Sequence, residues 1–320
     1  MTKKLLITSR SFGQVSDEPL NMLKEKGFEV DFYNEKYDEE DFLNMIGEYD
    51  ALIIGAHEFS RKAVEKAKKL KIVSKHGAGL DNIDIAAAKE KNLCVTNVPA
   101  TNSDAVADLA FGLMLDAARK ISFASSCVKK GLWDRVIGTD VCYKTLGLIG
   151  FGAIARNVAR RAAGFGMNVL VNDPFIDSIP EGFSHVKLTS FEGVLKNADF
   201  LSIHVPLNDN TRNLIGRDQM ASMKKGSFII NTSRGGIVNE EALHEFLENG
   251  HIAGTGLDVT EKEPPVGSPL LELDNVTILP HIGMYSREAI NAVSTICARN
   301  VVKMFNNEQL DNVVVHSTFL

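Results

Sequence analysis

The sequence predicts an α/β protein built from two doubly wound parallel-sheet domains. Short apolar runs alternate with helical patterns over residues 1–100, and the same alternation resumes in the second half of the chain. A glycine-rich turn between a strand pattern and a helix pattern, Gly150-Phe-Gly152, lies near the middle. Such β-α alternation is typical of a parallel sheet covered by helices, and 320 residues are enough for two domains.

Residues 1–100 contain the elements of one complete domain. Gly27 follows the first helical pattern, where a glycine commonly ends a helix. We expect strands at Leu5–Thr8, Glu29–Phe32, Ala51–Ile54, Ile72–Ser74 and Cys94–Thr96. We expect helices at Pro19–Lys26, Glu39–Ile46, Ser60–Lys68 and Ile85–Lys91.

A long helix follows this domain and opens the next one. Val106, Leu109, Leu113 and Ala117 recur at helical spacing, which predicts a helix from Ser103 or Asp104 to Arg119 with one buried face. Residues 119–144 read as a less regular segment. After the glycine turn we expect strands at Phe200–His204, Phe228–Asn231, Gly254–Asp258 and Val276–Leu279, and a helix at Glu240–Glu248.

The end of the chain is predicted to return to the first domain. The final helix, Arg287–Phe305, and the strand-like Val313–Val315 come after the strands of the second domain. We therefore expect residues 1–100 and 287–320 to form one domain and residues 101–286 the other, so that the chain crosses between the domains twice.

The composition excludes several functional classes. A hydrophobic content of 44% and a net charge of −6 indicate a globular protein and argue against nucleic acid as a partner, because phosphate binding needs a basic face. No apolar run reaches the length of a membrane span or a signal peptide. The four cysteines lack metal-site spacing, which favours a cytoplasmic protein with reduced thiols and no bound metal.

The glycine turn indicates a dinucleotide site. Gly150 allows a tight turn, and Gly152 lets a pyrophosphate approach the N-terminus of the following helix, near Ala153 and Ile154. Asp173 ends the next apolar run, about twenty residues later, where an acidic side chain accepts from a ribose hydroxyl. An ordinary β-α turn is the alternative, and the strand, helix and acid together argue against it.

Three side chains after later strands are candidates for catalysis. Arg234, Glu263 and His281 each follow an apolar run, so the fold gathers them at the sheet edge that carries the glycine turn. A guanidinium suits a carboxylate, and a histidine beside a carboxylate is suited to proton transfer near neutrality. Each residue taken singly is also compatible with a surface or structural role.

Five ordered motifs carry a resemblance to the D-isomer-specific 2-hydroxyacid dehydrogenases, and it extends over nearly the whole chain. The spans are Gly77–Asp84, Leu146–Ala155, Asn231–Gly236, Asp258–Pro264 and Pro280–Gly283. The resemblance implies two domains that are Rossmann-like or flavodoxin-like, with the cofactor domain inserted into the substrate domain. It also implies NAD as cofactor and a homodimer formed through the cofactor domain.

The resemblance also implies roles for single residues. Arg234 binds the substrate carboxylate, His281 is the general acid/base, and Glu263 orients His281. Expected substrate contacts, besides Arg234 and His281, are Lys75, Gly77, Ala78 and Gly79. Expected cofactor contacts are Gly150, Gly152, Ala153, Ile154, Asp173, His204, Pro206, Thr232, Ser233, Asp258 and Gly283, with Asp258 on the nicotinamide carboxamide.

Departures from the family pattern concern the substrate. Ala155 replaces a third glycine, which is a tolerated change. Thr260 and Met284 replace the usual aromatic residue and glycine. Gly55 stands where phosphoglycerate dehydrogenases are expected to carry a phosphate-binding arginine, and Lys75, His76 and Arg135 are alternative sources of positive charge. The chain still resembles those enzymes at Trp133–Arg135. Because the sequence stops soon after Val315, we expect no C-terminal regulatory domain.

The sequence therefore predicts hydride transfer between NAD(H) and a small 2-keto or D-2-hydroxy acid. D-3-phosphoglycerate dehydrogenase is one alternative for the specific activity. A second alternative is an NAD(H)-sensing corepressor, which has the same scaffold and can keep all three catalytic residues. Formate-oxidising relatives share the fold, but as a class they lack the partner that Glu263 gives to His281.

Overall fold

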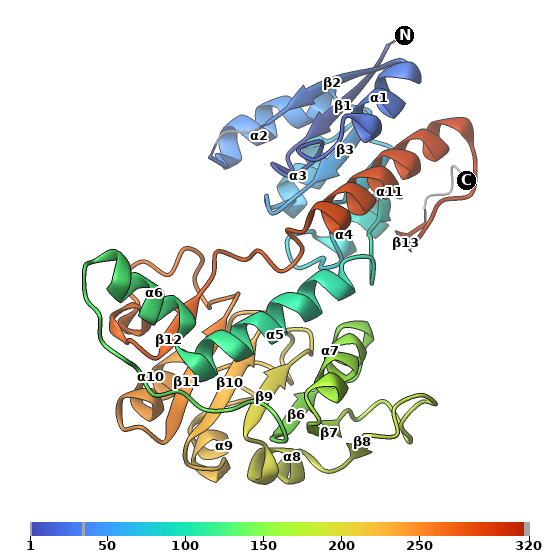
Figure 1. The fold of residues 1–320 in the computed structure, drawn as a ribbon. Coiled ribbons are helices and arrows are strands. Elements are labelled where there is room, and N and C mark those ends of the chain that lie inside the picture. The colour runs from blue at the N-terminus through green and yellow to red at the C-terminus, as the bar shows by residue number, and fades with distance from the viewer. Residues whose placement is uncertain (1, 34–35, 317–320) are drawn as a thin grey trace. The chain divides into compact units, whose positions relative to one another are not determined.

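The computed structural model describes residues 2–33 and 36–316 (Figure 1). The chain divides into two compact units. Unit 1 consists of Met1–Asn102 and Met284–Leu320, and unit 2 consists of Ser103–Gly283. The assignment of 1–100 with 287–320 to the substrate and of 101–286 to the cofactor stays a prediction.

Within the described residues, unit 1 contains one six-stranded sheet in the order β13-β5-β4-β3-β1-β2. Leaving out β13, this is the flavodoxin-like order, and β13 pairs antiparallel with β5. The strands are β1 (Lys3–Ile7), β2 (Phe28–Phe32), β3 (Ala51–Ile54), β4 (Ile72–Lys75), β5 (Cys94–Thr96) and β13 (Val313–Val315). The helices are α1 (Glu18–Glu25), α2 (Glu39–Met45), the short 3-10 helix Ile46–Glu48, α3 (Arg61–Lys66), α4 (Ile85–Glu90) and α11 (Arg287–Asn306).

Both faces of the unit 1 sheet are buried, as expected of a doubly wound fold. On one face, Leu5, Ile7 and Ile53 pack with Val293 and Val301 of α11. Figure 1 shows red α11 beside the blue strands of this unit. The opposite face packs against α2, α3 and α4. The end of the chain thus completes the core that its beginning starts.

Unit 2 contains a seven-stranded sheet in the order β12-β11-β10-β9-β6-β7-β8, within the part of the chain that the structure describes. All its pairings are parallel, and the strand order reverses beside β6, as in a Rossmann fold. The strands are β6 (Thr145–Ile149), β7 (Asn168–Asn172), β8 (Val186–Leu188), β9 (Phe200–Ile203), β10 (Ser227–Asn231), β11 (Ile252–Leu257) and β12 (Val276–Ile278). The helices are α5 (Ser103–Arg119), α6 (Ile121–Lys129), α7 (Ala153–Gly164), α8 (Phe191–Asn197), α9 (Arg217–Ser222), α10 (Glu240–Glu248) and the 3-10 helix Pro269–Glu272.

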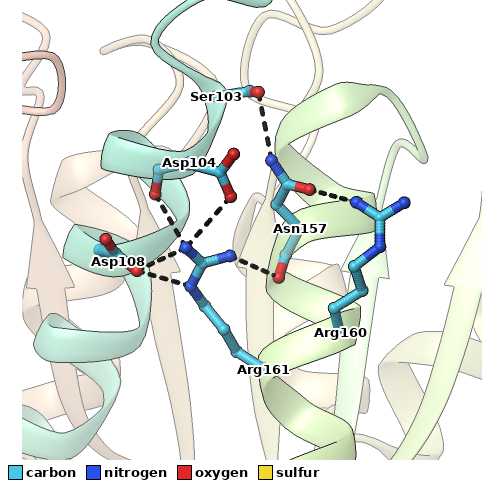
Figure 2. A network of polar contacts seen from close by, with 6 residues as sticks. All are labelled: Ser103, Asp104, Asp108, Asn157, Arg160 and Arg161. Atoms are coloured by element: carbon cyan, nitrogen blue, oxygen red, sulfur yellow. Dashed lines mark hydrogen bonds and ion pairs between the residues drawn. The ribbon is translucent and has the colours of Figure 1, made fainter. Parts of the chain in front are cut away.

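Helix α7, which follows the glycine turn, is held against α5 by small residues and by a polar network. Ala155 is fully buried in this packing, which explains why alanine is accepted in place of the family's third glycine. Figure 2 shows Arg161 of α7 between Asp104 and Asp108 of α5, at 3.2 and 2.5 Å. The Asn157 side chain donates to Ser103 Oγ at 3.2 Å. These contacts fix the helix whose N-terminus faces the predicted pyrophosphate.

The structure differs from the expectations mainly in short elements. The segment expected to be irregular contains α6, whose residues are all at least partly exposed. Part of its surface, including Phe123 and Cys127, is only partly exposed, so the helix lies on the surface of unit 2. The short β8, α8 and α9 were not predicted from the sequence. Among the described residues, no helix combines the length and apolarity that a membrane span requires.

Candidate active site

The glycine turn after β6 has the geometry that a dinucleotide site requires. Gly150 has a φ of 87°, and a Cβ there would lie 2.9 Å from the His204 carbonyl oxygen, so a side chain is excluded on both grounds. Gly152 is the N-cap of α7, and nothing lies within 4 Å of the place where its Cβ would be. The N-terminus of α7, at Ala153 and Ile154, is therefore open to an anion.

Asp173 lies beside this turn at the end of β7. One carboxylate oxygen accepts from Phe151 N at 2.8 Å and the other from Phe175 N at 2.9 Å. Each oxygen retains a lone pair, so the side chain can brace the turn and still accept from a ribose hydroxyl. The residues present thus fit NAD, and the role of Asp173 toward the ribose stays a prediction.

Two further predicted cofactor residues carry buried polar atoms at the ends of β9 and β10. His204 Nδ1 and Thr232 Oγ1 are buried and have no hydrogen-bond partner among residues 2–33 and 36–316. Burial lowers the pKa of His204 to about 4, so its imidazole is neutral, and Nε2 lies 2.9 Å from Ser202 Oγ. Because buried polar atoms are normally satisfied, these two atoms are consistent with a ligand at this edge.

The other two cofactor candidates on this edge have partners within the protein. The Pro206 carbonyl accepts from Thr211 Oγ1 at 2.6 Å, and Ser233 Oγ donates to Asn231 Oδ1 at 2.7 Å. Their predicted contacts with the cofactor stay predictions.

The turn that carries Arg234 is organised by Asn231, the last residue of β10. The Asn231 side chain accepts from Ser233 N at 3.0 Å and donates to the Arg234 carbonyl at 2.9 Å. Arg234 Nη1 donates to the Ser233 carbonyl at 2.7 Å. The guanidinium is therefore held close to its own turn at the carboxyl edge of the sheet.

Gly235 sets how closely this turn approaches the segment that follows β11. A Cβ at position 235 would lie 1.9 Å from the Thr260 carbonyl oxygen and 2.6 Å from Glu261 N. A side chain therefore cannot be placed there unless the backbone moves. The glycine allows the Arg234 turn to pack directly against residues 260–263.

Glu263 and His281 form a hydrogen-bonded pair. Glu263 Oε2 lies 2.9 Å from His281 Nδ1, and both side chains are nearly half exposed. Burial by itself raises the pKa of Glu263, but the contact with His281, the Thr260 amide and the charge of Arg234 outweigh it, so the pKa is lowered. Glu263 is thus a carboxylate at neutral pH, and Arg234 lies close enough to affect its charge.

Asp258 holds the loop that carries His281. Its two carboxylate oxygens accept from Ile282 N and Gly283 N, both at 2.7 Å, and the side chain is almost fully buried. His281 itself has a φ of 54°, an unfavourable conformation for a side chain of its size. The two hydrogen bonds to Asp258 offset this cost. A Cβ at Gly283 would lie 3.0 Å from Asp258 Oδ2, so the glycine makes room for the carboxylate.

Glu240, the first residue of α10, contacts the same loop. Its Oε1 accepts from Glu261 N at 2.5 Å. Burial raises the pKa of Glu240, and the nearby Glu261 and Glu263 add to this, while the hydrogen bond from the Glu261 amide opposes it. Glu240 therefore braces residues 260–263 from the side of the helix.

The predicted substrate residues of unit 1 lie on and after β4. Gly77 N donates to the Lys75 carbonyl at 3.0 Å, so the Gly77 amide is already engaged. The N–H groups of Ala78 and Gly79 donate to no acceptor within the described part of the chain, and Ala78 is exposed. Lys75 is different, because its ammonium is buried and donates to the Gly55 carbonyl and to Asn82 Oδ1.

Sequence reasoning did not single out Asn231, Glu240 or Asn82 as parts of the site. A signal for Asn231 was present, since it is a polar residue that ends the apolar run Phe228–Ile230. Asn82 lay inside a quoted motif without a role, whereas Gly235 was expected to open backbone space beside Arg234. Nothing in the sequence distinguishes Glu240 from Glu241, because the contact depends on a segment distant in the sequence.

Comparisons with known proteins agree with the geometry of unit 2. A family model described as D-isomer specific 2-hydroxyacid dehydrogenase, NAD binding domain, matches residues 111–283. The chain belongs to the D-isomer-specific 2-hydroxyacid dehydrogenases. It is accordingly an oxidoreductase with NAD as its cofactor.

Two curated relatives and one solved structure illustrate the range of activities. A D-3-phosphoglycerate dehydrogenase of Methanocaldococcus jannaschii is 43% identical over 86% of this chain, but the chain spans only 53% of that relative. A hydroxypyruvate reductase of Thermotoga maritima is 41% identical, with 86% of this chain and 91% of the relative covered. The crystal structure of a glyoxylate reductase from Paecilomyes thermophila has a TM-score of 0.86 at 30% identity, with 98% of each chain covered.

Proposed function

We propose that this enzyme interconverts a small 2-keto acid and its D-2-hydroxy acid, with Arg234, Glu263 and His281 as its catalytic machinery. The observation that carries the proposal is the 2.9 Å contact between Glu263 and His281, with Arg234 near enough to lower the pKa of Glu263. All three residues follow strands of the sheet that bears the glycine turn.

Each of the three residues has a distinct role in the proposed reaction. NADH, when bound, supplies the hydride. His281 gives its proton to the keto oxygen from Nε2, because Nδ1 faces Glu263. Glu263 fixes the orientation of the ring and stabilises its charged form. Arg234 binds the substrate carboxylate through its forked guanidinium.

We propose NAD rather than NADP as the preferred cofactor. The Asp173 carboxylate lies 2.8 Å from the backbone of the glycine turn, where it would repel a 2′-phosphate. Comparable catalytic efficiency with NADPH and NADH would contradict this preference.

An unphosphorylated substrate such as hydroxypyruvate or glyoxylate fits the chain better than 3-phosphohydroxypyruvate. Position 55, where a phosphate-binding arginine was expected, has no room for a side chain, because a Cβ there would lie 2.9 Å from Ser9 Cα. Relatives named as a hydroxypyruvate reductase and a glyoxylate reductase match 86% and 98% of this chain.

A panel of keto acids tests the proposal. Pyruvate, glyoxylate, hydroxypyruvate, branched-chain keto acids and 3-phosphohydroxypyruvate are each assayed with NADH and NADPH. We expect steady NADH oxidation at an ordinary enzymatic rate with at least one small unphosphorylated keto acid. NADH binding without turnover of any of them would instead support the corepressor alternative.

We also propose a homodimer formed through unit 2. Helix α6 buries none of its residues within the chain, and Leu132, Trp133, Ile137 and Tyr143 that follow it are exposed. Apolar side chains gathered on one segment in this way favour burial against a second copy. A Trp133→Glu variant should shift the mass measured by light scattering toward the monomer, and an unchanged dimer would exclude Trp133 from the interface.

A further inference from the structure

We propose that Asn82 and Lys75 are positioning residues that fix the backbone after β3 for keto-acid recognition. The inference rests on the proposed function, since it assigns this part of unit 1 to the substrate. The observation behind it is a partly buried set of hydrogen bonds that joins Lys75 and Asn82 to residues 55–57.

The side-chain amide of Asn82 makes three hydrogen bonds in this set. Its nitrogen donates to the Gly55 carbonyl at 3.1 Å and also to the His57 carbonyl. Its oxygen accepts from Lys75 Nζ at 2.7 Å. Asn82 therefore uses a donor and an acceptor at once, which aspartate, having no donor when ionised, cannot do.

Lys75 completes the set from the last position of β4. Only 9% of its surface is exposed, and Nζ also donates to the Gly55 carbonyl, at 2.6 Å. A buried ammonium must be satisfied by acceptors, and these contacts supply two. These contacts give Lys75 a role through the backbone of residue 55, and its direct contact with the substrate stays a prediction.

The braced segment is also packed on its other sides. Gly55 lies so close to β1 that a Cβ would meet Ser9 Cα at 2.9 Å. The His57 ring lies 5.4 Å from the ring of Tyr33 and 5.2 Å from that of Tyr37. The Asn82–Lys75 pair thus ties together the carboxyl edges of β3 and β4, and Gly55 packs against the segment that follows β1. Ligands bind at this edge in parallel sheets.

Lys75 and Asn82 lie on either side of residues 77–79, whose backbone is predicted to bind the substrate carboxylate. The carbonyls of Gly77 and Ala78 accept from Val98 N at 2.9 Å and from the Asn97 side chain at 2.8 Å. With these carbonyls held, the N–H groups of Ala78 and Gly79 remain for a ligand. Displacement of residues 55–57 should therefore weaken keto-acid binding and leave NADH binding, which belongs to unit 2, unchanged.

Asn82→Asp tests this in the full-length enzyme. The carboxylate keeps an acceptor for Lys75 but leaves the Gly55 and His57 carbonyls without the Asn82 donor. We expect KM for the best keto acid to rise roughly tenfold, with a smaller change in kcat and an unchanged Kd for NADH measured by fluorescence. Asn44→Asp, the same chemical change at an exposed position of α2, is the matched control and should behave as wild type.

The outcomes separate this inference from the proposed function. If the wild-type enzyme reduces no keto acid, the proposed function fails. If wild type is active and Asn82→Asp keeps its KM within twofold, or loses NADH affinity together with substrate affinity, the positioning role is wrong. If Asn82→Asp does not fold, Lys75→Met is measured in its place. A raised KM for the keto acid then supports the inference. A wild-type KM, or failure of this variant to fold as well, overturns it.

Discussion

The carboxyl edges of the two sheets are braced largely by groups of opposite kind, although Asn231 in unit 2 also donates to a backbone carbonyl, that of Arg234. In unit 1, side-chain donors hold backbone carbonyls: Lys75 and Asn82 hold Gly55, and Asn97 holds Ala78. In unit 2, carboxylate acceptors hold backbone N–H groups: Asp173 holds Phe151, Asp258 holds Ile282 and Gly283, and Glu240 holds Glu261. The edge of unit 1 leaves backbone N–H groups for a ligand. The edge of unit 2 instead gathers carboxylates near Arg234 and His281.

This difference indicates how the two sheets are suited to different proposed ligands, the keto acid and NAD(H). Free N–H groups suit the carboxylate of a keto acid. An edge rich in carboxylates instead suits a proton-transferring histidine and a ribose, provided that a helix N-terminus and an arginine are present for the anionic groups. The predictions that follow change one group at a time.

Replacement of Arg234 by alanine should give the largest effect, because it removes a cation from the acidic edge. The substrate carboxylate would be left unpaired at a cost of roughly 2–5 kcal/mol, or roughly 30-fold to several thousand-fold in kcat/KM. Steady-state kinetics with the best keto acid measure this. Arg217→Ala, which removes an exposed ion pair with Glu245, is the control. A loss below tenfold would remove Arg234 from the proposed role.

Glu263→Gln should lower the rate of keto-acid reduction roughly tenfold and shift its pH optimum downward. The amide keeps the shape but not the charge that favours a protonated imidazole. The pKa of Glu263 is lowered in the folded protein, so its ionised form also stabilises the wild-type fold. This stabilisation is fully present above the ordinary pKa of glutamate and is lost as the pH falls through the lowered pKa. A pH–rate profile identical to that of wild type would exclude Glu263 from proton transfer.

Glu240→Ala tests a carboxylate that acts only as a brace. Loss of the acceptor for Glu261 N should lower kcat roughly fivefold, since the loop that carries Glu263 loosens. Glu240→Gln retains an acceptor and should restore most of kcat. Glu241→Ala is the matched control on the exposed neighbour in the same helical turn. Equal loss in the alanine and glutamine variants would show that charge, and not the hydrogen bond, matters.

Arg161→Met should have the smallest effect on activity, because this brace lies away from the sheet edge (Figure 2). Losing its contacts with Asp104 and Asp108 should lower the free energy of unfolding by about 1 kcal/mol, measured by urea titration. The kinetic constants should not change. Lys196→Met on the exposed side of α8 is the control, and a fall in kcat for Arg161→Met would mean that α7 moves.

The sequence predicted most of the fold for physical reasons, and it named the three candidate catalytic residues, whose roles stay predictions. Strands such as Ala51–Ile54 are buried on both faces, so they appear in the sequence as continuous apolar runs. The turn after β6 requires glycine at position 150, where no other residue type fits. The side chains that hold backbone groups at the two sheet edges were not predicted. The role of Glu240, for example, depends on the Glu261 N–H, which lies 21 positions away in the sequence. The contacts of Lys75 within the protein were not predicted for the same reason, since Gly55, whose carbonyl accepts from it, follows a different strand.

Unit 1 is built from both ends of the chain, and this affects how the protein folds during synthesis. Strand β13 pairs with β5, and α11 covers one face of the sheet. While the ribosome is still making unit 2, Leu5, Ile7, Ile53 and Ile72 lack the helix that buries them. Unit 2, Ser103–Gly283, is continuous and can complete its core first. The nascent chain therefore lacks the helix that covers one face of this sheet until unit 2 has been made.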